Sequence, residues 1–157
     1  MKKSSVPARP PYYAQETEYS CMVACLRMVL EHLGVVRTEK ELRILTDCDF
    51  DSPHHPGGAE ARHVVDVARQ FGFVNTSKNN LKLQELVGVL IQGRFPIVQI
   101  GIRLPSNPLL QSHAVVVIEI DERGVSILDP LRGEIVHTQE EFDQMWQRQR
   151  GLTILIE

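Results

Sequence analysis

Apolar residues recur every three or four positions between residues 21 and 33, at Met22, Cys25, Leu26, Val29, Leu30 and Leu33. This spacing is typical of an amphipathic helix. Ser20 can serve as its N-cap, and Gly34 supplies a stop at its other end. The pattern therefore predicts a helix over residues 21–33 that begins with Cys21 in its first turn.

Helical spacing returns in four further stretches, over residues 38–45, 59–71, 81–91 and 140–147. The first of these opens with Thr38 and Glu41, which stand in a capping-box arrangement. Thr138 can cap the last one. Gly72 and Gly93 follow the second and third stretches, where glycine commonly ends a helix.

After residue 95 the apolar residues form short strand-like runs, which predict strands over residues 96–102, 113–120, 125–128, 134–137 and 152–156. A short strand is also predicted over residues 73–75. Residues 104–112 contain two prolines and are predicted to be a loop. Helices first and an antiparallel sheet second favour an α+β fold, with N-terminal helices packed on a C-terminal sheet. We expect an extended lead-in over residues 1–14 and a single domain over residues 15–157.

Composition excludes some classes of function. With 43% hydrophobic and 24% charged residues, the 157-residue chain resembles an ordinary soluble globular protein. Its net charge of −3 gives no electrostatic reason to bind nucleic acid or an acidic membrane. Three cysteines cannot all pair, and no apolar stretch follows the first residues, so we expect a reducing, cytoplasmic setting. No apolar run approaches the roughly 20 residues of a membrane span.

The position of Cys21 suggests nucleophilic chemistry. Free backbone N–H groups and the positive end of the helix dipole favour a thiolate over a thiol at a helix start. The same N–H groups can stabilise an oxyanion that forms when the thiolate attacks a carbonyl. Such a nucleophile also needs a base, a group that orients the base, and a second oxyanion donor.

The chain offers a candidate for each of these roles. His113 opens one predicted strand and Asp129 ends the next, and an Asp-Glu-Arg-Gly turn joins the two strands. A hairpin of this kind brings His113 and Asp129 close together. Gln15 precedes Cys21 by six residues, so its side-chain amide can be the second oxyanion donor.

Structural roles remain open for the same residues. Cys21 can be a small buried core residue, His113 a strand residue bonded to a carbonyl, and Asp129 a turn cap. Cys25, one helical turn from Cys21, is expected to pack in the core. The spacing of these two thiols does not fit a metal site. Cys48 with His54, His55 and His63 is a weaker zinc alternative, so we predict no metal and no cofactor.

These residues and motifs together resemble the bacteriocin-processing, double-glycine leader peptidases, which are papain-like cysteine peptidases. Gln15, Cys21 and the following Ala24-Cys25-Leu26 match the start of that family, and His113-Ala-Val-Val and Asp129-Pro-Leu-Arg-Gly match its later motifs. The resemblance covers residues 15–154. One departure is Met22, which stands where the family usually has glycine and is expected to put a side chain near the substrate groove.

The resemblance implies a papain-like fold and a role for each residue. Cys21 would be the nucleophile, His113 the acid and base, Asp129 the orienter and Gln15 an oxyanion-hole donor. The implied reaction is hydrolysis of a peptide bond in a leader peptide or a small protein partner, and an export transporter is a further candidate partner. Two alternatives use the same residues or fold: a peptide-binding module without catalysis, and an amide hydrolase or acyltransferase acting on a non-peptide substrate.

Overall fold

The first predicted helix is present as α1 (Cys21–His32) in the computed structural model, which describes residues 9–48, 58–104 and 107–157. The apolar residues of α1 are buried, whereas Arg27 and Glu31 are more exposed. Gly34 has a φ of 94°, a left-handed conformation that glycine adopts without strain. The amphipathic pattern and the glycine stop therefore predicted this helix correctly.

The other predicted helices are also confirmed, with ends shifted by at most two residues: α2 (Glu39–Leu45), α3 (Ala61–Gln70), α4 (Leu83–Ile91) and α5 (Gln139–Gln147). Two threonines cap their helices as predicted. The Thr38 hydroxyl accepts from the Glu41 backbone N–H at 3.1 Å, and the Thr138 hydroxyl accepts from that of Glu141 at 3.1 Å. These caps satisfy backbone donors that a helix start otherwise leaves free.

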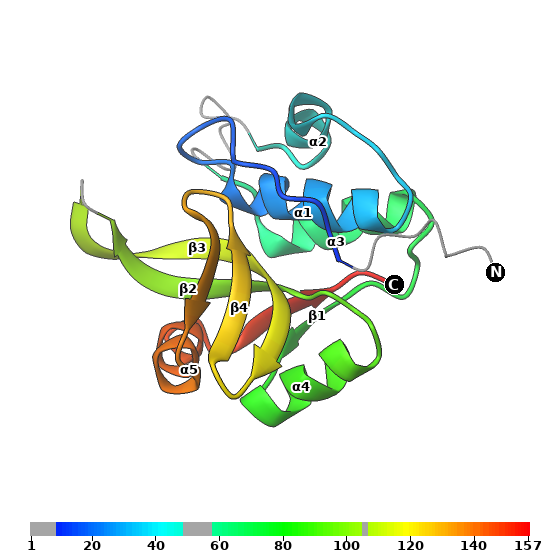
Figure 1. Cartoon of the computed structure of the whole chain (residues 1–157). Coiled ribbons are helices and arrows are strands. Elements are labelled where there is room, and N and C mark those ends of the chain that lie inside the picture. The colour runs from blue at the N-terminus through cyan, green and yellow to red at the C-terminus, as the bar shows by residue number, and fades with distance from the viewer. Residues whose placement is uncertain (1–8, 49–57, 105–106) are drawn as a thin grey trace.

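Within the described ranges, the strands form one antiparallel sheet of six in the order β1-β6-β2-β3-β4-β5. Their bounds are β1 (Ser77–Asn80), β2 (Ile97–Leu104), β3 (Asn107–Asp121), β4 (Gly124–Asp129), β5 (Gly133–His137) and β6 (Leu152–Leu155). The central β2–β3 pair is a long hairpin that projects beyond the rest of the sheet (Figure 1).

Helices cover both faces of this sheet (Figure 1). On one face, α1 and α3 pack in a hydrophobic cluster that includes Ile97 of β2. On the other, Phe142 and Trp146 of α5 pack against Val98 and Ile100. Alternate residues of a strand point to opposite faces, so one strand serves both clusters. The predicted α+β class, with N-terminal helices on an antiparallel sheet, is confirmed.

Two predictions of local structure are wrong. Residues 73–75 do not form the predicted strand, and Val74 is exposed. The strand in this region is β1, whose polar residues pair with β6. The predicted loop over residues 104–112 is largely strand, since β3 begins at Asn107 and pairs with β2 along the hairpin. A register shift at Arg103 and Leu104 lies beside the prolines that suggested a loop.

Among the described residues, no helix is both long and apolar enough to cross a membrane.

Candidate active site

Cys21 is the first residue of α1 and is partly exposed. Ser20 occupies the N-cap position, since its carbonyl accepts from the Ala24 N–H at 2.9 Å, but its hydroxyl does not cap the helix. Met22 is only 3% exposed and belongs to the core cluster, so the expectation that it lies near a substrate groove is wrong. Cys21 is therefore partly exposed at the start of this helix, between the buried residues Ser20 and Met22.

A buried carboxylate fixes the loop that leads into Cys21. The Glu39 side chain, on α2, is 1% exposed, and its Oε1 accepts from the Glu16 backbone N–H at 3.0 Å and from the Ser20 hydroxyl at 3.2 Å. Burial raises the pKa of Glu39, although the bonds from Glu16 and Ser20 and the charge of Arg43, 3.3 Å away, oppose that rise. Sequence reasoning missed this role, because Glu39 resembles an ordinary acidic residue in a first helical turn.

We expect Glu39→Ala to lower the free energy of unfolding by about 2 kcal/mol, because the Glu16 N–H and the Ser20 hydroxyl lose a buried acceptor. Urea unfolding followed by circular dichroism measures this change. Glu41→Ala is the matched control, since Glu41 lies on the same helix with its side chain 55% exposed. Its expected cost is below about 0.5 kcal/mol. Equal costs for the two variants would contradict the role given to Glu39.

His113 and Asp129 meet as the predicted hairpin requires. The β3–β4 register pairs Val116 with Leu128, which leaves Asp129 at the end of β4 close to His113 on the neighbouring strand. His113 Nε2 lies 2.7 Å from Asp129 Oδ1, and the residues are only 4% and 0% exposed. A hydrogen bond between two ionisable groups is strong in such a setting, because water does not compete for it.

The pKa of His113 is raised from its ordinary value of 6.5 to about 9. Burial by itself lowers this pKa, but the hydrogen bond with Asp129, and then the hydrogen bond with Cys21, outweigh it. The structure thus brings Cys21, His113 and Asp129 into one chain of contacts. Since Nε2 faces Asp129, Nδ1 is the ring nitrogen that remains for the thiol.

Asp129 has further partners that hold it ionised. Oδ1 accepts from the Leu131 backbone N–H at 2.8 Å, and Oδ2 accepts from Arg132 Nε at 3.0 Å. Burial raises the pKa of Asp129, but the bonds from His113, Leu131 and Arg132 more than offset this, and the net pKa is lowered. Arg132 was not predicted, although it stands within the Asp-Pro-Leu-Arg-Gly motif.

Gln15 lies near this group, but among the described residues its hydrogen bonds go to other partners than the thiol. Its backbone N–H donates to the Pro130 carbonyl at 3.0 Å, and the neighbouring Tyr12 hydroxyl donates to the Asp129 carbonyl at 2.8 Å. The Gln15 side-chain amide donates to the Thr17 carbonyl at 2.7 Å. That amide carries two hydrogens, so this bond occupies only one of them.

The remaining cysteines are buried in the core. Cys25 is 0% exposed, as predicted. Burial raises the pKa of its thiol well above the ordinary value, and the electrostatic interactions with Cys21 and Asp129 raise it by smaller amounts. Cys48 is 1% exposed, with its sulfur 3.9 Å from the Tyr19 carbonyl. The zinc alternative also involves His54 and His55, which lie outside the described residues. Within the described part of the chain, no group of His, Cys, Asp and Glu side chains is arranged to hold a metal.

Comparisons with known proteins point to one family. A family model described as the peptidase C39 family matches residues 9–157. The lactococcin-G-processing and transport ATP-binding protein LagD of Lactococcus lactis subsp. lactis is 24% identical over an alignment of 141 residues, and the match covers 84% of this chain. The chain spans only 17% of that relative's length.

Three solved structures share the fold. A C39-like peptidase from Bacillus anthracis has a TM-score of 0.77 at 17% identity, covering 99% of this chain and 98% of that one. The peptidase domain of Streptococcus ComA, a bifunctional ABC transporter, has a TM-score of 0.72 at 23% identity, with 92% and 96% covered. A double-glycine-motif protease of an AMS/PCAT transporter, solved with a leader peptide, has a TM-score of 0.68 at 19% identity, with 98% and 96% covered.

Proposed function

Because the chain belongs to the peptidase C39 family of papain-like cysteine peptidases, we propose that it cleaves a leader peptide or small protein partner through Cys21, His113 and Asp129. The observation that carries this proposal is the buried His113–Asp129 pair, 2.7 Å apart, with Cys21 near enough to His113 to raise its pKa. A pKa of about 9 keeps His113 protonated at neutral pH. Cys21 and His113 then act as a thiolate–imidazolium pair.

In the first half of the reaction, the Cys21 thiolate attacks the scissile carbonyl carbon and pushes its electron pair onto the oxygen. The backbone N–H of Cys21 and the second amide N–H of Gln15 stabilise that oxyanion. His113 donates its proton from Nδ1 to the leaving amine as the C–N bond breaks. The amine product departs, and the acyl group stays on Cys21 as a thioester.

In the second half, neutral His113 takes a proton from a water molecule that attacks the thioester carbonyl. The C–S bond breaks, the carboxylic acid product leaves, and the thiolate–imidazolium pair is restored. Asp129 holds the ring through Nε2 and stabilises its charged form in both halves. Tyr12 and Leu131 in turn bind the backbone and side chain of Asp129, which keeps the ring orientation fixed.

The substrate class rests on family membership and on the relatives. The lactococcin-G-processing relative and the protease solved with a leader peptide both favour a leader peptide, with adjacent glycines before the scissile bond as the first choice. Both relatives belong to transporters, so a transporter is the proposed partner, and the cytoplasm is the proposed setting. Met22 does not argue against glycine specificity, because its side chain lies in the core.

The rate of Cys21 alkylation by iodoacetamide tests the thiolate–imidazolium pair. An ordinary thiol, with a pKa of about 8.5, is well below 1% ionised at pH 6. We expect wild-type Cys21 to react more than about tenfold faster at pH 6 than it does in His113→Ala. Mass spectrometry of the labelled peptides gives the rate at each pH, and buried Cys25 and Cys48 serve as internal controls.

The result also separates the alternative functions. If both proteins label Cys21 only above about pH 8, as an ordinary thiol does, the pair is not formed, and a peptide-binding module explains the fold better. If the pair is formed but no peptide containing adjacent glycines is cleaved, an amide hydrolase or acyltransferase on a non-peptide substrate is favoured. Cleavage of such a peptide supports the proposed peptidase.

A further inference from the structure

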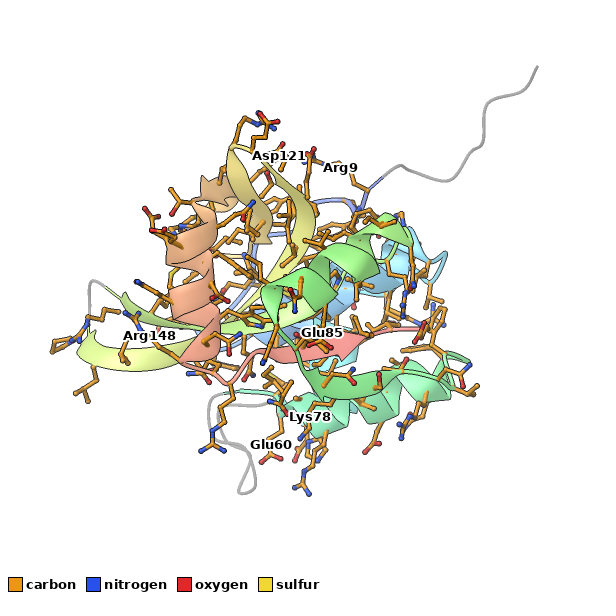
Figure 2. The ribbon with its side chains drawn as sticks, turned by 90° about the horizontal axis from the view of Figure 1, so that it is seen from below. Arg9, Glu60, Lys78, Glu85, Asp121 and Arg148 are labelled. Carbon is orange, nitrogen blue, oxygen red and sulfur yellow. The ribbon has the colours of Figure 1, made fainter. Side chains whose placement is uncertain are left out.

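A pocket of about 630 Å³ lies beside the proposed catalytic group, between β2, the β4–β5 turn, β5 and α5. Its apolar lining comes from Ile102, Leu131 and Met145, and three arginines also line it: Arg103, Arg132 and Arg148. We name it the arginine pocket. Arg148 lies at the end of α5 beside the β2–β3 hairpin (Figure 2). No step of the proposed reaction uses this pocket.

The arginine pocket is built from the same backbone that holds the catalytic histidine. The register places Ile100 opposite His113, and Ile102 follows two residues later on the same face of the sheet. Ile102 therefore lines the pocket from the same face of the sheet as His113. On the other side, Leu131 lines the pocket, and its backbone N–H donates to Asp129 Oδ1.

The positive charge of the pocket is only partly neutralised. Arg132 is paired with buried Asp129, and His137, which also lines the pocket, lies 3.7 Å from Glu141. Arg103 and Arg148 bond instead to backbone carbonyls, those of Pro108 at 2.8 Å and Gly101 at 3.1 Å. In the described ranges neither of these two arginines has an ion-pair partner. Each guanidinium has five N–H donors, so each keeps donors for a further acceptor.

The position of the pocket indicates which part of a substrate reaches it. The oxyanion donors lie at Gln15 and at the start of α1, whereas His113 must face the leaving amine to protonate it. The chain that follows the amine therefore continues past His113, toward Leu131 and the β2–β3 hairpin. An apolar lining beneath cationic donors fits an apolar side chain next to a carboxylate.

We propose that the arginine pocket binds the substrate segment that follows the scissile bond, with an apolar side chain against Leu131 and Met145 and an Asp or Glu side-chain carboxylate at Arg103 and Arg148. This subsite rests on the proposed peptidase function, because it assigns the leaving-group side of that reaction. It makes Arg103 and Arg148 determinants of specificity and leaves them outside the bond-breaking steps.

Two C-terminally amidated peptides test the subsite. Both have Gly-Gly before the scissile bond, followed by Leu-Asp-Leu-Glu in one and by Leu-Asn-Leu-Gln in the other. We expect wild-type kcat/KM to be roughly tenfold higher for the acidic peptide, and the preference to shrink at high salt. Arg103→Glu and Arg148→Glu should remove or reverse the preference, and the milder Arg148→Gln should reduce it.

The control is Lys78→Glu, which makes the same change of charge on the edge strand β1, away from the pocket (Figure 2). This variant should keep the preference of the wild type. Equal cleavage of both peptides by the wild type, or an unchanged preference in the two Arg→Glu variants, overturns the subsite and leaves the peptidase function standing. Cleavage of neither peptide, with Cys21 alkylated as an ordinary thiol, refutes the peptidase function and the subsite with it.

Discussion

Replacing Cys21 with alanine is expected to lower kcat/KM on a Gly-Gly peptide by at least roughly 10³-fold, because the acyl group then has no atom to attach to. The fold should survive, since Cys21 is partly exposed and alanine suits the first turn of a helix. Initial rates measured with a fluorogenic peptide give the activity, and circular dichroism gives the fold.

Cys25→Ala is the matched control, because Cys25 lies one turn later on α1 and is fully buried. Its loss should leave kcat/KM within a few-fold of the wild type and lower the stability by about 1 kcal/mol, through the small cavity left behind. If Cys21→Ala retained most of the activity, or if Cys25→Ala lost as much as Cys21→Ala, Cys21 would not be the nucleophile.

Local signals were enough to predict the elements that carry the site. The apolar stripe after Ser20 and the glycine stop at Gly34 define α1 and hence the position of Cys21. The four-residue turn between two apolar runs defines the β3–β4 hairpin, and the hairpin in turn brings His113 to Asp129. His113 and Asp129 are only 16 residues apart in the sequence, so the register of the hairpin that joins them follows from local turn geometry.

Elements without a hydrophobic pattern were not predictable in the same way. β1 is polar along its length and exists because its backbone pairs with β6, more than 70 residues later. Pro108 suggested a loop, yet β3 runs through it toward the hairpin tip. Proline is tolerated near the end of a strand where its missing N–H is not needed by a partner.

Contacts between polar residues that are far apart in the sequence were not predictable either. Glu39 and the loop around Glu16 come together only when α2 packs on α1, and no local pattern reports that contact. The sequence therefore predicted that Cys21, His113 and Asp129 come together, but not the carboxylate that holds the Cys21 loop or the arginine that pairs with Asp129. These supporting residues depend on tertiary packing.

Asp129→Asn is expected to lower kcat/KM by roughly 10³-fold while Cys21 and His113 remain in place, because a neutral amide cannot stabilise the imidazolium. The pKa of His113 should fall from about 9, since burial persists and the carboxylate that opposes it most strongly is gone, whereas the interaction with Cys21 remains. Imidazole signals in NMR titrations measure this fall. The free energy of unfolding at pH 6 should decrease by about 2 kcal/mol as charge-assisted hydrogen bonds are lost.

The pH dependence of stability gives a second signature of the same pair. With its pKa raised to about 9, protonated His113 stabilises the wild-type fold fully below pH 6.5, and this contribution is lost as the pH rises to 9. Because the pKa of Asp129 is lowered, its carboxylate stabilises the fold above pH 3.8, the ordinary pKa of an Asp side chain. This contribution is lost as the pH falls further into the acid range. Urea unfolding of Asp129→Asn should show a smaller loss on the basic side, and the loss in acid that comes from residue 129 should be absent.

Arg132→Gln separates the role of the carboxylate from that of its surroundings. The Arg132 side chain is 52% exposed, so its ion pair with Asp129 should contribute less than about 1 kcal/mol. His113 should therefore still titrate near pH 9 in this variant and fall only in Asp129→Asn. A His113 that kept its high pKa in Asp129→Asn would show that the Cys21 thiolate alone holds the proton, and Asp129 would then be a structural cap of the β4–β5 turn.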